Sequence, residues 1–231
     1  GVRDVLEAPY GGFCSSYADK YDLDWATREL GEEFEMRKNG FKRYSSLASS
    51  QTSVDALRAI REKHGVRGED VESVLIRTTN MVYVHCGWPY EPKETITAQM
   101  NLPYTAAVTL LEGNAFIDQY TDDKLRDPKI VDLASRIKVV VDPELDAGGP
   151  HEMRAVRVTV KTKSGEEYTE SQTYRSGHWR NPLSDEVLSA KFKDLAGRVL
   201  KPTAVERIDT LVRKLEGAAE PAPELGEALQ D

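Results

Sequence analysis

The sequence contains few of the side chains that most often carry thiol or metal chemistry, with two cysteines and four histidines among 231 residues. The cysteines, Cys14 and Cys86, are too far apart for a CxxC motif, and nothing else indicates secretion. We therefore expect reduced structural thiols in a cytoplasmic protein, with a single disulfide as the alternative. No two histidines have the spacing of a zinc site, so we expect ordinary surface or loop residues and no bound metal. They are His64, His85, His151 and His178.

Long apolar runs, a charged-then-apolar leader and an excess of basic residues are also missing. No stretch approaches the roughly 20 apolar residues that cross a bilayer, which predicts a soluble protein without a membrane partner. The net charge of −8 and the pI of about 5.2 argue against a nucleic-acid partner. Neither GxGxxG nor GxxxxGK[ST] occurs, so we expect no nucleotide cofactor.

The sequence contains a clear helical pattern near its start and a buried helical run near its middle. Val54, Leu57 and Ile60 recur every three residues and predict a helix over 50–64, which Gly65 ends. The apolar run 102–111 predicts a buried helix with a proline in its first turn. Between these helices, we expect a loop rich in aromatic residues and prolines at 85–92.

Period-2 alternation predicts the strands. Residues 71–79 and 137–141 are β-branched and apolar. Valines alternate with polar residues over 156–161, and a Lys-Ser-Gly turn leads to a returning strand at 167–174. Helices and strands both occur but do not alternate regularly along the chain, which predicts an α+β fold.

We expect four parts along the chain: a helical lead-in (1–40), an α+β domain (41–175), amphipathic helices (176–216) and a disordered tail (217–231). The amphipathic helices need an apolar surface to cover. That surface belongs either to the α+β domain or to something absent from this chain.

A candidate site precedes the predicted helix at 50–64. Lys42 and Arg43 offer charge for a carboxylate, Tyr44 offers a hydroxyl donor, and Ser45 and Ser46 offer neutral donors. Placed beside the free N–H groups of a helix start, they would form a carboxylate pocket. The alternative is that the cations lie on the surface and the serines cap the helix.

Four segments resemble, in the same order, motifs of the 2-methylcitrate dehydratase/cis-aconitate decarboxylase (MmgE/PrpD) family. Lys42-Arg43-Tyr44 with Val54-Asp55-Ala56 resembles K-x-Y-P…H-x-x-(I/L)-D-A, and residues 98–104 resemble A-(K/Q)-F-S-L-P-Y. Residues 110–128 resemble a helix–loop–helix passage of the family, and residues 181–192 resemble N-P-(L/M)-(S/T)…K-F. The resemblance covers roughly residues 21–200.

The resemblance implies a large helical domain and a smaller α+β lid domain with the active site between them. Members are usually dimers that act on small di- and tricarboxylates by dehydration, decarboxylation or epimerisation, generally without a metal. This chain resembles the C-terminal half, namely the lid and the returning helices of a large domain whose N-terminal part is absent. A second chain would then supply that helical part and most acid/base residues.

By the same resemblance, Lys42 and Tyr44 are the expected catalytic residues, and we expect Arg43, Ser45, Ser46 and Gln51 to bind substrate. The motif differs at several positions. Ser45 replaces a proline, Ser46 and Leu47 replace a cysteine or catalytic histidine, and Gln51 replaces a histidine.

Two hypotheses follow from the resemblance and these differences. The first is a subunit of a split lyase or isomerase without a cofactor. The alternative is a non-catalytic binding or regulatory member that has lost the family's histidine and cysteine positions.

Overall fold

The computed structural model describes residues 4–149, 152–217 and 221–230, so His151 lies outside the described residues. The chain divides into two compact units, residues 1–39 and 40–231. The first unit contains three short helices, α1 (Phe13–Tyr17), η1 (Leu23–Ala26) and η2 (Glu35–Lys38). Among its described residues no hydrophobic side chain is buried, and Tyr10 is 97% exposed. This unit therefore has no core of its own.

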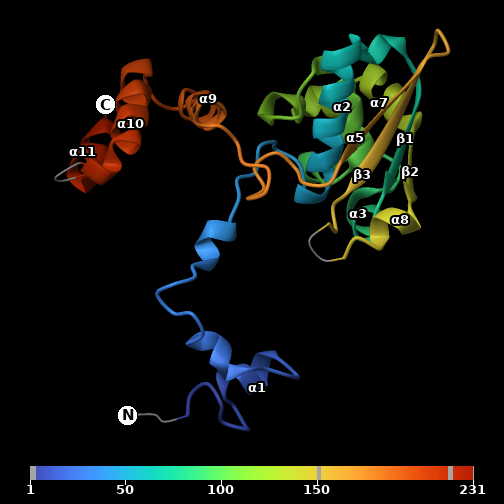
Figure 1. Cartoon of the computed structure of the whole chain (residues 1–231). Coiled ribbons are helices and arrows are strands. Elements are labelled where there is room, and N and C mark those ends of the chain that lie inside the picture. Colours follow the sequence, from blue (N-terminus) through green and yellow to red (C-terminus); the bar gives the residue numbers. More distant parts are fainter. Residues whose placement is uncertain (1–3, 150–151, 218–220, 231) are drawn as a thin grey trace. The chain divides into compact units, whose positions relative to one another are not determined.

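A four-stranded mixed sheet organises the second unit (Figure 1). Its strands β1 (Val71–Thr78), β2 (Ile137–Val141), β3 (Val156–Thr162) and β4 (Glu167–Gln172) lie in the order β2-β1-β3-β4. β1 is parallel to β2 and antiparallel to β3, which pairs with β4 as a hairpin. Buried and half-buried residues alternate along β3, which confirms the period-2 prediction. The α+β fold class is therefore confirmed.

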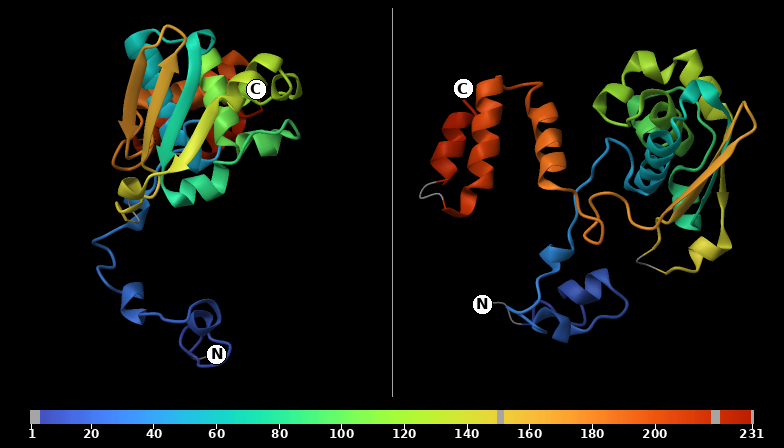
Figure 2. Two further views of the ribbon diagram at one scale, coloured as in Figure 1. Left: turned by 90° about the vertical axis from the view of Figure 1, so that its right-hand side faces the viewer. Right: turned by 45° about the horizontal axis from the view of Figure 1, so that its top comes forward.

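Three helices pack against the sheet, α2 (Gln51–His64), α5 (Leu102–Glu112) and α7 (Pro128–Ser135) (Figures 1 and 2). The helices predicted at 50–64 and 102–111 are confirmed. Each ends at a glycine in the left-handed conformation, Gly65 (φ 71°) and Gly113 (φ 81°). The core lies between these helices and the sheet, and its largest fully buried aliphatic side chains include Leu57, Ile60 and Ile76.

Shorter helices complete this part of the unit: η3 (Ala48–Ser50), η4 (Gly68–Asp70), α3 (Asn80–Cys86), α4 (Thr95–Gln99), η5 (Ile117–Gln119), α6 (Asp122–Leu125) and α8 (Pro143–Asp146). The predicted loop at 85–92 is wrong at its first two residues, because His85 and Cys86 end α3. Thr79 starts that helix, since its hydroxyl accepts a hydrogen bond from the Val82 N–H.

The C-terminal region is helical, with α9 (Asp185–Ala196), α10 (Pro202–Arg213), η6 (Leu215–Gly217) and α11 (Pro221–Ala228). The Ser184 hydroxyl caps α9 by accepting a hydrogen bond from the Val187 N–H. α10 packs against both α9 and α11, and Ala228 is buried. Part of the tail expected to be disordered is thus a helix, since packing against α10 compensates for its low hydrophobicity.

Apolar side chains remain exposed on these helices and their connections. α9 buries none of its residues, and α10 buries only Ala204, Val205 and Ile208. Val199 is 84% exposed and Val212 is 54% exposed. The contacts within this chain therefore leave much of the predicted apolar surface uncovered.

The chain enters and leaves the α+β region through one narrow crossing, which we call the neck (Gly40, Phe41, Ser176 and Gly177). The Phe41 N–H donates to the Gly177 carbonyl at 2.7 Å. A Cβ on Gly40 would collide with the Gly177 carbonyl oxygen, and one on Gly177 (φ 83°) would collide with that of Phe41. Glycine is therefore required on both sides of the crossing.

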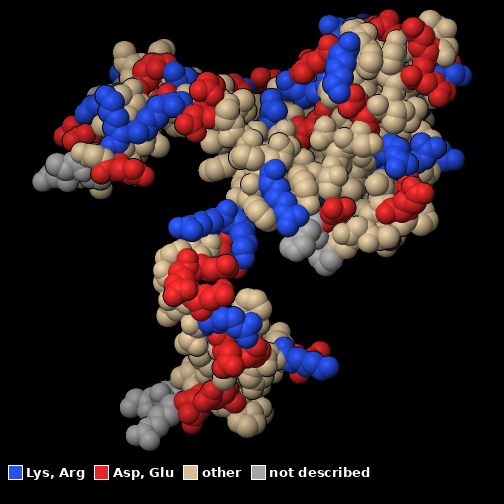
Figure 3. All heavy atoms as spheres, in the orientation of Figure 1, with Lys and Arg blue, Asp and Glu red and all other residues tan. Residues whose placement is uncertain are grey.

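Charges of both signs are interspersed over the face of the molecule seen in Figure 3. No described helix combines the length and the apolar character that a membrane span requires.

Candidate active site

A cavity of about 410 Å³ opens beside the neck and brings together residues from all four segments that resemble family motifs. Lys42 and residues 44–47 form one side, and Ile96, Gln99 and Met100 of the α4 region form another. Phe116 completes the lining together with Lys191 and Leu195 of α9. Among the residues that the structure describes, its lining includes two lysines but no histidine, cysteine, aspartate or glutamate. The cavity therefore has an uncompensated positive charge and lacks a conventional acid/base group.

Lys42 lies on the rim of this cavity with an exposed side chain. It takes part in no ion pair with any residue that the structure describes, and its backbone carbonyl accepts a hydrogen bond from the Lys191 ammonium group. The Lys42 ammonium group is thus available to an anion in the cavity.

Tyr44 lines the same cavity, but its hydroxyl group has a protein partner. The ring is only 3% exposed, and the hydroxyl donates to Asp55 Oδ1 at 2.7 Å. Asp55 also accepts hydrogen bonds from the N–H (2.6 Å) and the hydroxyl (2.8 Å) of Ser176. Burial, assisted by the Asp55 charge, raises the pKa of Tyr44 well above its usual range. Tyr44 therefore remains a neutral donor. Through Asp55, it links the segment that follows Phe41 to Ser176 on the other strand of the neck.

Arg43 contacts Tyr44 and Ser176. Its guanidinium group lies 5.3 Å from the centre of the Tyr44 ring and donates to the Ser176 hydroxyl at 3.4 Å. Arg43 lines two smaller hollows of about 170 and 200 Å³, but it is not part of the lining of the 410 Å³ cavity. The structure thus separates these two adjacent cations.

Gln51 is completely buried at the start of α2. Its side-chain oxygen accepts from the Arg43 N–H, and its amide group donates to the carbonyls of Tyr44 and Ser46, each at 3.3 Å. Gln51 does not line the cavity. It fixes the backbone of residues 43–46 and thereby positions the segment that carries Lys42.

The predicted serines occupy different environments. Ser45 and Ser46 both line the cavity, Ser45 half-buried and Ser46 only 1% exposed. The Ser50 hydroxyl lies 2.9 Å from that of Ser46 and makes no capping hydrogen bond to α2. The first residues of α2 are buried and absent from the cavity lining, so the helix start does not face the cavity.

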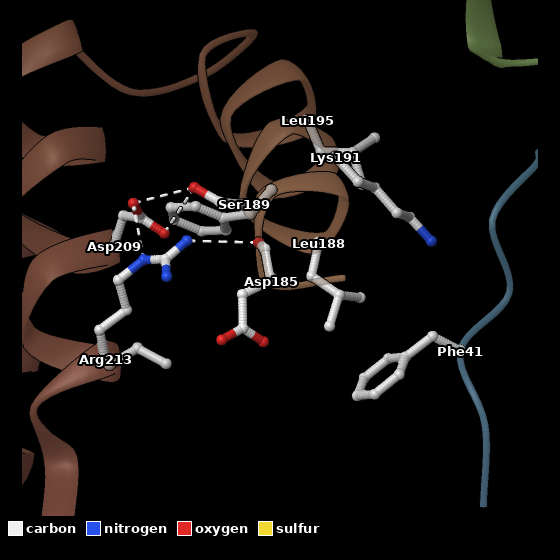
Figure 4. A pocket seen from close by; sticks show the side chains of 10 residues that line it. Phe41, Asp185, Leu188, Ser189, Lys191, Leu195, Asp209 and Arg213 are labelled. Atoms are coloured by element: carbon white, nitrogen blue, oxygen red, sulfur yellow. Dashed lines mark hydrogen bonds and ion pairs between the residues drawn. The ribbon is translucent and has the colours of Figure 1, made fainter. Parts of the chain in front are cut away.

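A larger hollow, of about 650 Å³, lies between α9, α10 and Phe41 (Figure 4). Three of its polar groups contact one another: Asp209 accepts from the Ser189 hydroxyl at 2.9 Å and from Arg213 Nε at 3.4 Å. Phe41, Leu188 and other apolar side chains form much of the remaining lining of the hollow. This hollow suits an apolar surface better than a charged metabolite.

The chain is similar in sequence to known proteins. The model of the MmgE/PrpD C-terminal domain matches residues 44–217. The chain belongs to the MmgE/PrpD family. It is 26% identical over 216 residues to human cis-aconitate decarboxylase, covering 91% of this chain and 44% of that protein. It is 28% identical to the mouse cis-aconitate decarboxylase (94% and 44% covered) and 26% identical to the Aspergillus terreus protein of the same name (96% and 48%). The chain spans about half the length of these curated relatives.

Two residues that organise this MmgE/PrpD site were not singled out from the sequence. Asp55 belongs to the quoted Val54-Asp55-Ala56 segment, and Lys191 belongs to the closing Lys-Phe pair. Lys191 follows Leu188 by three residues and precedes Leu195 by four, so it lies on the apolar stripe of α9. A lysine within an apolar stripe was the signal that could have identified it.

The described histidines lie outside the lining of the 410 Å³ cavity. His64 stacks on Tyr168, His178 stacks on Tyr174, and His85 Nδ1 lies 3.3 Å from the Ser49 hydroxyl. Within residues 4–149, 152–217 and 221–230, no three metal-binding side chains cluster.

The two thiols are expected to differ in reactivity. Cys14 is half-buried, whereas Cys86 is completely buried and burial raises its pKa to about 12. Because the thiolate is the reactive form, we expect Ellman's reagent at pH 8 to modify only Cys14 in the folded protein and both thiols in denaturant. Cys14→Ser is the control and should abolish the native reaction. Rapid native modification of two thiols would contradict the buried position of Cys86.

Proposed function

We propose that this chain provides the substrate-carboxylate site of an MmgE/PrpD-type lyase or isomerase that acts on a small di- or tricarboxylate. The observation that supports it is the 410 Å³ cavity, into which Lys42 brings a cation without a counter-ion among the described residues. A cavity of this size is within the range of small-molecule sites. The relatives are named cis-aconitate decarboxylases, which makes cis-aconitate the first substrate to test.

Lys42 would act by charge stabilisation. In a decarboxylation, the bond to the departing carboxylate breaks, CO2 leaves, and the electron pair delocalises towards a remaining carboxylate. In a dehydration or an epimerisation, removal of a proton beside a carboxylate creates the same enolate-like charge. An ammonium group placed at that carboxylate stabilises the negative charge as it develops. The Ser45 and Ser46 hydroxyls and the Gln99 amide line the same cavity and can donate to the other oxygens.

A second chain that carries the N-terminal helical domain would complete the enzyme. Two observations support this partner. The described lining of the cavity has no histidine or carboxylate to move a proton, and the C-terminal helices and their connections expose apolar side chains such as Val212 and Val199. The hollow beside Phe41 and Leu188 offers an apolar surface for packing. The pair, or a dimer of such pairs, would work in the cytoplasm.

The test is reconstitution with a helical partner isolated from the same source. We expect the complex to release CO2 from cis-aconitate, or to dehydrate or epimerise a related polycarboxylate, and each chain alone to be inactive. The native mass of the purified complex should exceed the 25.9 kDa of this chain by at least the partner's mass. An inactive complex that still binds polycarboxylates would reject catalysis and leave the second candidate.

That second candidate is a non-catalytic MmgE/PrpD-like binding or regulatory protein. It is favoured by Leu47 and Gln51, which stand where the sequence comparison led us to expect a catalytic histidine or cysteine. Gln51 is buried on the backbone and offers no proton-transfer group to the cavity. Polycarboxylate binding without turnover in the reconstituted complex would establish this function.

A further inference from the structure

We propose that Lys191 is a second substrate-binding cation, which together with Lys42 selects ligands with two carboxylates over those with one. The inference rests on the proposed carboxylate function of the same cavity. It adds a residue that the sequence did not assign to the site and predicts a selectivity that one cation cannot produce.

The position of Lys191 is the first argument. It projects from the apolar stripe of α9, is half-buried, and lines the cavity beside Leu195. Its ammonium group donates to the Lys42 carbonyl, which anchors the charge at the entrance of the neck. An ammonium group has three donors, so this hydrogen bond leaves donors for a ligand.

The second argument is that the acidic residues which form ion pairs at α9 pair with cations other than Lys191. Lys193, two residues further, pairs with Glu206 at 2.7 Å and lies 3.7 Å from Asp209. Asp194 and Asp118 both pair with Arg198, at 3.2 and 2.8 Å. By contrast, Lys191 forms no ion pair with any residue that the structure describes. Two adjacent cations thus face the cavity without a protein counter-ion.

The pKa of Lys191 is consistent with two neighbouring cations. Burial, followed by the nearby charge of Lys42, lowers the pKa of Lys191. Two like charges in a partly desolvated cavity repel each other when the cavity is empty. A dianion neutralises both charges, whereas a monoanion leaves one uncompensated. The charge pair therefore favours two carboxylates.

The remaining lining fits the carbon skeleton of such a ligand. Ile96, Met100, Phe116 and Leu195 supply apolar contacts, while Ser45 supplies a neutral donor. A short aliphatic chain with a carboxylate at each end matches this combination of apolar wall and paired cations. The predicted ligand class is a short-chain dicarboxylate, with or without a third carboxylate.

The experiment compares succinate with propionate as probes of residues 1–231. Lysine reactivity is measured by reductive dimethylation and mass spectrometry, with and without each probe, and succinate affinity is measured by calorimetry. We expect succinate to protect both Lys42 and Lys191, and propionate at the same concentration to protect them much less. The Lys191→Met variant should bind succinate about tenfold more weakly or worse, close to the affinity for propionate.

Lys193→Met is the matched control, because it removes a lysine of the same helix that is already paired with Glu206. It should retain succinate binding, and circular dichroism should show that both variants fold. Protection of Lys42 without Lys191, or an unchanged affinity in Lys191→Met, would overturn the role of Lys191 and leave the carboxylate site. Protection of neither lysine would overturn the carboxylate site as well. Equal losses in the two variants would also reject a specific role for Lys191.

Discussion

Replacing Lys42 with alanine is expected to lower turnover by tenfold or more in the complete enzyme. A lost hydrogen bond to a charged group costs about 1.5–3 kcal/mol, which corresponds to about 10- to 150-fold in rate. The measurement is CO2 release from cis-aconitate by the reconstituted complex, with kcat and KM determined separately. If Lys42 stabilises charge that develops during the reaction, kcat falls, whereas a purely binding role raises KM.

The control for Lys42→Ala is Lys163→Ala in the exposed turn between β3 and β4. It removes the same charge from the chain without touching the cavity, so turnover should remain unchanged. Unchanged turnover in Lys42→Ala would remove Lys42 from the mechanism. An equal loss in both variants would show that net charge, rather than this position, affects the rate.

Local sequence patterns predicted most of the secondary structure because the determining interactions are themselves local. α2 follows from its apolar spacing and from Gly65, and α9 follows from the Ser184 cap. The strand β3 follows from its alternating valines. α3 was missed because it is short, and its start depends on the single hydrogen bond to Thr79.

The arrangement of the strands depends on contacts that are distant in sequence. Nothing in β1 or β2 alone shows that they pair in parallel, with Val74 opposite Ile137. Likewise, the sequence led us to expect the adjacent residues Lys42 and Arg43 in one carboxylate pocket. Only the packing of Tyr44 and the neck turns Arg43 away from the cavity.

The candidate site was predicted from residues that lie close together in sequence, and this is why it was incomplete. Lys42, Ser45 and Ser46 line the cavity, as a local cluster can. Lys191 comes from a helix about 150 residues further along the chain, and Gln51 turns inward to the backbone. The roles of these residues remain predictions for the experiments above. Their positions depend on tertiary contacts that spacing alone does not encode.

Replacing Asp55 with alanine is expected to lower the free energy of unfolding by about 3 kcal/mol, because three hydrogen bonds converge on this one side chain. Their donors are the Tyr44 hydroxyl and the N–H and hydroxyl of Ser176. Removing the carboxylate leaves these donors without their partner in a region where Tyr44 is almost fully buried. Urea denaturation followed by far-UV circular dichroism measures the change.

The control is Asp132→Ala, which removes an exposed helix carboxylate paired with Arg136 and should change stability by less than about 1 kcal/mol. Tyr44→Phe removes only one of the three hydrogen bonds to Asp55 and should cost about 1–2 kcal/mol. Because the Tyr44 hydroxyl already donates its hydrogen bond to Asp55, Tyr44→Phe should lower the free energy of unfolding and have a smaller effect on kcat. If Tyr44→Phe instead lowers kcat as much as Lys42→Ala and leaves stability unchanged, the hydroxyl acts on substrate. The bond to Asp55 then breaks during catalysis.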